Sequence, residues 1–360
     1  MQVQQDDANY TTGENQSEIH RNDMGCIDDA AIAGKRRRTA KAMTRFLGFA
    51  VLVGIFCFID FGKLYENLMN VRLVYLGLGI LMLFPLFALK AGRWYLLMRT
   101  QGIPYTFGQT LLVWTSANFI AFITPGRLGE VAKAFYVRKD TSIPIAGTFP
   151  TVILDRLFDV YFLMAVATYG FFRFSLLARF QVVSWVIIGF ILIFPWLMLK
   201  RGIAMTVIRL LLKLPGLKRL APKITDMADL FFDEMKKLIN ARLIIAAFLT
   251  VGAYLFLFTA TWFIATAADI QIDFVTISIF IAIANILSFV PISVSGVGTR
   301  DASLVFLFSL VGLSAEMAVL YSSLFFLVFF LVGGFIGYLC FLIKPIRIDS
   351  IKMPAAKSEN

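Results

Sequence analysis

Two stretches of this chain place a proline, glycines, an arginine and an acid close together within apolar sequence: ANFIAFITPGRLGE and ANILSFVPISVSGVGTRD. In the first stretch, Pro125 pushes the residue before it out of helical geometry, and Gly126 and Gly129 permit a turn. A helix that restarts after this break presents free N–H groups and the positive end of its dipole, where Arg127 lies. Together these groups predict a site for an anion such as a phosphate.

The second stretch repeats the same kinds of group. Pro291 ends the apolar run, the serines that follow offer hydroxyl groups, and the glycines allow close approach of the backbone. Thr299 is a predicted helix N-cap, and Arg300 with Asp301 repeats the combination of an arginine and an acid. The predicted anion-binding residues are Arg127, Arg300, Gly126, Gly129, Ser293, Ser295, Gly296 and Gly298.

A third group of charged residues lies in the motif DRLFD, which contains Asp155 and Asp159. Because these acids are four residues apart, they share one helix face, about 10–16 Å into a predicted span. Two hypotheses remain open for them: coupling to protons, or pairing with the arginines at positions 93, 127 and 156. The residues predicted to form a charge network or to couple protons are Glu130, Asp155, Arg156, Asp159, Asp301 and Arg93.

Other residue types limit the possible chemistry. Asn118 and Asn285 lie deep in the two motifs and are predicted to hold the helices together, with Pro125 and Pro291 at the breaks. The one histidine, His20, lies in a polar tail, and the three cysteines are scattered. The sequence therefore predicts no metal site and no cofactor, and it contains no Walker A motif for ATP.

These motifs lie in a chain that is dominated by apolar residues. Of 360 residues, 59% are hydrophobic, and the mean hydropathy is +0.79. Several runs are long enough to cross a hydrocarbon layer of ~30 Å, so we predict an all-α integral membrane protein. The net charge of +11 comes from basic residues beside these runs, which is typical of the positive-inside rule and of anionic lipid headgroups rather than of nucleic-acid binding.

The apolar runs and the charged stretches between them predict the organisation of the chain. Residues 1–45 are predicted to be a disordered polar and basic cytoplasmic tail, residues 46–343 a transmembrane domain, and residues 344–360 a short cytoplasmic tail. Residues 200–242 form an amphipathic cytoplasmic connection, with ten Lys and Arg against four acids. The predicted full spans are Phe46–Gly62, Leu73–Leu89, Thr148–Phe172, Val182–Leu199, Leu243–Ala267 and Met317–Ile343.

The charges also predict how the chain crosses the membrane. With both termini and the basic connection in the cytoplasm, the second span ends on that side at Lys90, Arg93 and Arg99. The broken run Gln109–Arg138 must then begin and end inside, and the broken run Phe274–Val311 must begin and end outside. We therefore predict about six full transmembrane helices plus two re-entrant helical hairpins of opposite orientation, as in inverted-repeat transporters.

The motifs PGRLGE, DRLFD and PISVSGVGTRD, in this order, resemble those of the transmembrane flippase-like domain of lysylphosphatidylglycerol synthases, over roughly residues 45–344. That family typically has glutamate at the positions of Asp155 and Asp301, and paired glycines where this chain has Ser295 and Gly296. The resemblance implies a lipid translocase with two re-entrant hairpins and, because the soluble synthase domain has no counterpart here, no enzyme activity. The residues it implies along the lipid path are Arg127, Glu130, Asp155, Arg156, Arg300 and Asp301.

We therefore expect a flippase of the cell inner membrane that moves a phosphate-bearing lipid, either a phospholipid or a polyprenyl-linked lipid. Its expected partners are anionic or polyprenyl-linked membrane lipids, with a homodimer and a separate lipid-modifying enzyme or glycosyltransferase as further candidates. Two alternatives remain open: a membrane-embedded lipid-modifying enzyme, and a non-transporting subunit of a cell-envelope lipid or glycan pathway. The position of His20 in the tail argues against most versions of the enzyme.

Overall fold

The computed structural model describes residues 71–124, 128–174, 189, 193, 200–211, 221–288 and 298–345. The predicted tail of residues 1–45 and the predicted span Phe46–Gly62 lie outside the described residues. The same holds for the predicted span Val182–Leu199, apart from residues 189 and 193, and for residues 346–360 of the C-terminal tail.

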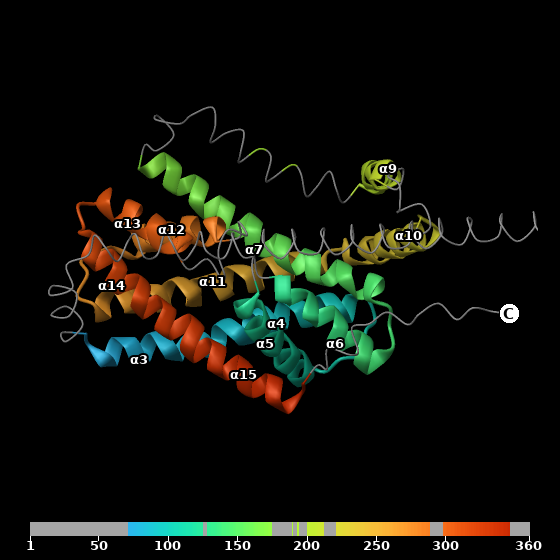
Figure 1. Ribbon diagram of the computed structural model, residues 1–360, viewed down its shortest axis with the longest axis horizontal. Coiled ribbons are helices and arrows are strands. Elements are labelled where there is room, and N and C mark those ends of the chain that lie inside the picture. Colours follow the sequence, from blue (N-terminus) through green and yellow to red (C-terminus); the bar gives the residue numbers. More distant parts are fainter. Residues whose placement is uncertain are drawn as a thin grey trace, which may run out of the picture.

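The described part of the chain is entirely helical and contains no strand (Figure 1). The longest helices run along a common axis, and α11 packs against both α3 and α4. The elements are α3 (Leu73–Leu81), α4 (Leu83–Thr100), α5 (Phe107–Ile123), a 3₁₀ turn (Leu128–Val131), α6 (Ala132–Thr141), α7 (Ile145–Arg173), α9 (Arg201–Leu211), α10 (Ala221–Leu238), α11 (Arg242–Ala267), α12 (Phe274–Leu287), α13 (Thr299–Ser309), α14 (Ala315–Phe326), a π-helical stretch (Leu327–Val332) and α15 (Gly333–Ile343).

Among the described residues, three helical segments are long and apolar enough to cross a membrane: Leu73–Thr100, Arg242–Ala267 and Ala315–Ile343. The last two confirm predicted spans. The first corrects a prediction, because α4 continues well past Leu89, where the span was expected to end. That boundary placed Lys90 and Arg93 in water, whereas both side chains are paired with acids of α7 inside the bundle.

α7 matches the predicted span Thr148–Phe172 and extends it to 29 residues. A helix of this length is roughly 43 Å long, which exceeds the hydrocarbon thickness. Its middle carries the charged motif DRLFD, so its composition is less apolar than that of the other long helices. α7 packs against α12, α10, α6 and α4, and it therefore connects both halves of the bundle.

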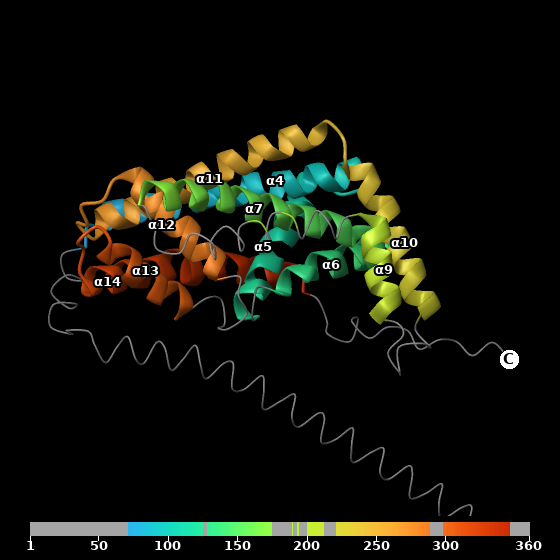
Figure 2. The same ribbon diagram turned by 90° about the horizontal axis from the view of Figure 1, so that it is seen from above.

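Each of the two broken motifs folds as a helix, a break and a second helix that packs back on the first. α5 contacts the 3₁₀ turn and α6, and α12 contacts α13. In both views the α5–α6 hairpin lies in the half of the bundle that α10 borders, and the α12–α13 hairpin lies in the opposite half (Figures 1 and 2). The two hairpins therefore approach the middle of the bundle from opposite ends.

The first helix of each hairpin begins at an N-cap side chain. The Thr106 hydroxyl accepts a hydrogen bond from the Gln109 N–H at 3.3 Å, and the Asp273 carboxylate accepts one from the Thr276 N–H at 2.9 Å. Hydrogen bonds from Thr276, of which the hydroxyl bond is the strongest cause, lower the pKa of Asp273 below its ordinary value. Both caps fix the residue at which the chain enters its hairpin.

The second helix of the α12–α13 hairpin begins one residue earlier than predicted. Thr299 is the first helical residue rather than the N-cap, and Gly298 occupies the cap position with φ of 89°. The Asp301 carboxylate accepts a hydrogen bond from the Gly298 N–H at 2.9 Å. Because φ is strongly positive, this position favours glycine, and the acid three residues later supplies the cap that Thr299 was expected to provide.

The connection between residues 200 and 242 contains the two helices α9 and α10, which lie at one end of the bundle (Figure 2). The apolar side of α10 packs against both α7 and α4. Its Met235 and Leu238 are buried against Leu97 of α4. Its charged residues, such as Asp226 and Lys236, are exposed. These helices are therefore amphipathic, as the sequence predicts.

The closest helix contact in the α5–α15 interface occurs at Gly337. A Cβ atom there would lie 2.8 Å from Phe119 Cβ and 2.9 Å from the Thr115 carbonyl oxygen. We expect Gly337→Ala to lower the free energy of unfolding in detergent by about 1–3 kcal/mol, because the two backbones must move apart. Thermal unfolding of the purified protein, followed by thiol-reactive fluorescence or circular dichroism, measures the change.

Gly77→Ala is the matched control, since a Cβ atom at this helical position would meet nothing within 4 Å. We expect the melting temperature of this variant to equal or exceed that of the wild type, because alanine favours the helix. Equal melting temperatures for both variants would contradict the close approach of α5 and α15.

Candidate functional site

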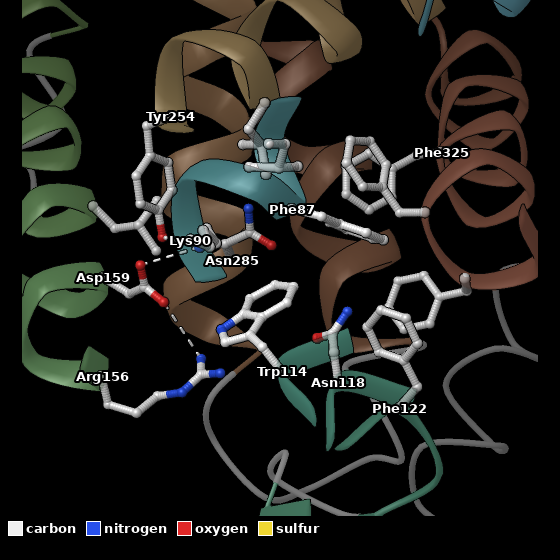
Figure 3. Close-up of a pocket in the computed structure, with 15 residues that line it drawn as sticks. Phe87, Lys90, Trp114, Asn118, Phe122, Arg156, Asp159, Tyr254, Asn285 and Phe325 are labelled. Atoms are coloured by element: carbon white, nitrogen blue, oxygen red, sulfur yellow. Dashed lines mark hydrogen bonds and ion pairs between the residues drawn. The ribbon is translucent and has the colours of Figure 1, made fainter. Parts of the chain in front are cut away.

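A cavity lies in the middle of the bundle, between the two hairpins (Figure 3). The space in it that is open to water-sized molecules is about 70 Å³. Helices α4, α5, α7, α11, α12 and α14 and the π-helical stretch all contribute side chains. The lining residues are Leu86, Phe87, Lys90, Trp114, Asn118, Phe122, Arg156, Asp159, Leu163, Tyr254, Leu257, Asn285, Phe325, Phe329 and Phe330.

One end of the cavity carries charged side chains from α4 and α7. Lys90 Nζ lies 3.0 Å from Asp159 Oδ1, and Arg156 Nη1 lies 3.7 Å from Asp159 Oδ2. Figure 3 shows both cations on either side of the Asp159 carboxylate. The Arg156 side chain is 25% exposed and that of Lys90 is 12% exposed, so both cations are reachable from the cavity.

Behind this surface, Arg93 of α4 holds both acids of the DRLFD motif. Its Nε donates to Asp155 Oδ1 at 2.7 Å, and its Nη1 donates to Asp159 Oδ1 at 2.9 Å. Nη1 also donates to the hydroxyl of Thr250, in α11, at 3.0 Å. Arg93 and Asp155 are each only 1% exposed. The predicted pairing with Arg93 is therefore present, and it joins α4, α7 and α11 at one point.

The α5–α6 hairpin joins the same network through Lys133 and Glu130. Lys133 Nζ lies 2.9 Å from Asp155 Oδ2 and 3.3 Å from Glu130 Oε2. Glu130 also forms a close ion pair with Arg156 of α7. Glu130, which was predicted to belong to a charge network, is therefore paired with two cations, Lys133 and Arg156. The hairpin is thus fixed to α7 by ion pairs on both sides.

Within the described residues, this buried network joins four cationic side chains to three carboxylates, which leaves one positive charge in excess. Its members are Lys90, Arg93, Lys133, Arg156, Glu130, Asp155 and Asp159. Removing one partner of a buried pair exposes the remaining charge to an apolar environment, which is strongly unfavourable. The excess charge lies next to the cavity, where it favours an anionic ligand.

The other end of the cavity is an aromatic wall, which we define as Phe87, Phe122, Phe325, Phe329 and Phe330. Phe122 stands against Phe330 with ring centroids 4.7 Å apart, and Phe325 stacks on Phe329 at 4.4 Å. Part of this wall comes from the π-helical stretch, a helix type that is frequent at functional sites. The cavity therefore has a charged end and an apolar end.

Arg300 and Asp301 lie behind the aromatic wall rather than at the surface of the cavity. The Arg300 guanidinium is 4.6 Å from the Phe325 ring centroid and 5.2 Å from that of Phe330. It also lies 3.2 Å from Asp301, which accepts a close hydrogen bond from the hydroxyl of Ser322. Arg300 is 2% exposed and does not line the cavity.

Some residues singled out in the sequence are placed by the structure, and others are not. Asn118 and Asn285, which were predicted to hold the helices together, line the cavity, one from each hairpin. Gly129 packs against the backbone of α5, where a Cβ atom would lie 2.5 Å from the Ile120 carbonyl carbon. The residues outside the described part of the chain are Pro125, Gly126, Arg127, Pro291, Ser293, Ser295 and Gly296.

No sequence pattern singled out Lys90, Lys133 or the aromatic wall as part of the site. Lys90 was predicted to mark the end of a span, but it lines the cavity. Lys133 was predicted to flank the first hairpin, but it is fully buried. Their spacing carried a signal, because Lys90 is three residues before Arg93 and Lys133 is three residues after Glu130. Phenylalanine is too frequent in this chain for single rings to stand out.

The sequence is similar to those of known membrane proteins. Residues 45–337 match the family described as the lysylphosphatidylglycerol synthase TM region, and this range contains every residue of the cavity. The chain is also similar to the UPF0104 membrane protein of Methanocaldococcus jannaschii, with 23% identity over 335 residues that cover 88% of this chain and 99% of the relative. No solved structure matches the chain.

The buried network predicts a large effect of removing a single charge at its centre. Asp155→Asn preserves the shape of the side chain but leaves Arg93 and Lys133 short of a carboxylate. We expect a loss of about 3–5 kcal/mol in the free energy of unfolding. The measurement is thermal or denaturant unfolding in detergent, together with the yield of monodisperse protein.

Asp229→Asn is the matched control, because its pair with Arg201 at 2.7 Å is solvent-exposed. An exposed pair contributes about 0–1 kcal/mol, so the stability of this variant should stay close to that of the wild type. If Asp155→Asn is equally harmless, the network does not hold the helices together.

Proposed function

The chain belongs to the family of the lysylphosphatidylglycerol synthase transmembrane region and is a multi-pass membrane protein, and on this premise we propose that it is a lipid flippase. It moves a phosphate-bearing lipid headgroup, of a phospholipid or a polyprenyl-linked lipid, across the inner membrane. The proposed site is the cavity between the two hairpins. The observation that carries the proposal is the division of this cavity into a cationic end and an aromatic end.

The cationic end offers two groups for a phosphate. Arg156 and Lys90 face the cavity, and the network to which they belong has one positive charge in excess. A bound phosphate supplies the missing negative charge and competes with Asp159 for both cations. Charge-assisted hydrogen bonds from a guanidinium group to phosphate oxygens are among the stronger polar contacts in proteins.

The aromatic wall suits the apolar part of the lipid next to the phosphate. Its phenyl rings present no charge to the cavity, and Leu86 and Leu163 add further apolar lining. A lipid can therefore place its headgroup at the charged end while its chains stay in apolar surroundings. This arrangement lowers the cost of moving a charged headgroup through the hydrocarbon layer, where an unpaired charge is costly.

The proposal includes a topology with both termini in the cytoplasm, about six full spans and two re-entrant hairpins. Support comes from the positions of the hairpins in opposite halves of the bundle (Figures 1 and 2). Non-helical backbone at membrane depth needs protein or water around it, and a central cavity provides such surroundings. Each break would then reach the cavity from its own side of the membrane.

The flippase proposal predicts a specific defect when the accessible cations lose their charge. We expect Arg156→Gln and Lys90→Gln each to slow the movement of a fluorescent anionic phospholipid in proteoliposomes by about tenfold or more, because a charged hydrogen bond to the phosphate is lost. Quenching of the outward-facing label by dithionite follows the movement. Arg201→Gln, on the exposed surface of α9, is the control and should keep the wild-type rate.

The same assay separates the flippase from its two rivals. A chemically altered lipid, detected by mass spectrometry after incubation with the purified protein, would identify a lipid-modifying enzyme. If the wild-type protein moves no lipid when it is reconstituted alone, a non-transporting subunit that needs a separate enzyme or glycosyltransferase is favoured. Wild-type rates in both charge variants would remove Arg156 and Lys90 from the mechanism.

The topology can be tested with single cysteines placed on each hairpin. Gly108→Cys and Lys139→Cys flank the α5–α6 hairpin, and Gln271→Cys and Ser309→Cys flank the α12–α13 hairpin; all four positions are exposed. We expect an impermeant maleimide to label the first two from the cytoplasmic face and the last two from the outer face of cells. Labelling of Gly108→Cys and Lys139→Cys from opposite faces would show that this element crosses the membrane.

A further inference from the structure

The indole N–H of Trp114 has no acceptor although it is buried. Trp114 is 4% exposed, and its Nε1 has no hydrogen-bond partner within the described residues. The ring itself is firmly placed, since its centroid is 5.5 Å from that of Phe87 and the Lys133 ammonium lies 5.4 Å from it. In Figure 3 the indole nitrogen is on the side of the ring that faces Arg156 and Asp159. A buried donor with no partner indicates a missing acceptor in the cavity.

Two carboxamides face the same cavity from equivalent places in the two hairpins. Asn118 follows Ala117 in the first motif, and Asn285 follows Ala284 in the second. Both line the cavity, and within the described residues neither amide forms a hydrogen bond. A carboxamide donates and accepts hydrogen bonds at once. A hydroxyl group has the same two capacities and is therefore its natural partner.

The charges of the cavity select against a cationic headgroup. The excess positive charge of the network and the exposure of Arg156 and Lys90 repel an ammonium group and attract a phosphate. The remaining polar groups of the cavity that lack partners are neutral. A ligand that satisfies all of them carries a negative phosphate and, next to it, uncharged groups that donate and accept hydrogen bonds.

We propose that the cavity selects lipids whose phosphodiester carries an uncharged headgroup with several hydroxyls, such as glycerol or a ring polyol. The phosphate lies against Arg156 and Lys90, and the hydroxyls bind Trp114, Asn118 and Asn285. This inference rests on the proposed flippase function, because it places the headgroup of the transported lipid in the same cavity. It adds the chemical class of that headgroup.

Binding to the purified protein tests the proposal without requiring transport. Four lipids with identical acyl chains are compared by native mass spectrometry and by thermal stabilisation: phosphatidylmethanol, phosphatidylglycerol, phosphatidylinositol and phosphatidylethanolamine. The first three have the same charge, and phosphatidylmethanol lacks headgroup hydroxyls. We expect at least one of the two hydroxylated lipids to bind roughly five- to tenfold tighter than phosphatidylmethanol, and phosphatidylethanolamine to bind most weakly. Whichever of phosphatidylglycerol and phosphatidylinositol binds more tightly tells whether the site fits glycerol or a ring polyol.

Variants assign this preference to the named groups. Trp114→Phe keeps an aromatic ring but lacks the N–H, and Asn118→Leu and Asn285→Leu each remove one carboxamide. Each should reduce binding of the preferred hydroxylated lipid roughly three- to tenfold and leave phosphatidylmethanol binding unchanged. Trp262→Phe is the control, because this residue packs against Phe263 in α11 and does not line the cavity. It should behave as the wild type with all four lipids.

Equal binding of phosphatidylmethanol and both hydroxylated lipids by the wild type would overturn the proposal, as would a preference for phosphatidylethanolamine. Failure of the flippase function gives a different result. In that case the binding preference and its loss in the variants persist, while no lipid moves in proteoliposomes. Conversely, lipid movement at equal rates for all four headgroups would leave the flippase in place and remove the headgroup selection.

Discussion

The structure depends on the requirement that a charge in an apolar interior has a partner. Arg93 satisfies it at the centre of the bundle, where it holds Asp155 and Asp159 of α7 and the hydroxyl of Thr250 in α11. Lys133 brings the α5–α6 hairpin to the same acids. Because an unpaired ion at this depth is strongly unfavourable, these contacts fix the relative positions of α4, α6, α7 and α11 more specifically than apolar packing between similar side chains can.

The same network has members that are sealed inside the bundle and members that line the cavity. Arg93 and Lys133 are almost completely buried and are engaged by carboxylates, whereas Arg156 and Lys90 extend into the cavity. One positive charge remains in excess, so the network that stabilises the bundle also favours an anion at its surface. The aromatic wall opposite comes partly from a π-helical stretch, and Arg300 lies behind its rings.

Much of the architecture followed from local sequence, and the errors have a common cause. Hydropathy located α11 within one residue of its observed start, and the proline–glycine motifs located the breaks in both hairpins. The end of the second span was wrong because the positive-inside rule treats a lysine or an arginine as a boundary, and it has no information on a partner from a distant helix. Lys90 and Arg93 lie inside α4 because α7, more than 60 residues later, supplies their acids.

The sequence by itself determined that the protein is helical and membrane-spanning, that two motifs interrupt its helices, and that acids and arginines are buried, because apolar length, proline and glycine act locally along the chain. Only the tertiary structure decided which charges meet, which cations remain accessible, and that Asn118, Asn285 and Trp114 face one cavity. Those relations join residues that are far apart in the sequence. They arise from the packing of the helices, which no local pattern specifies.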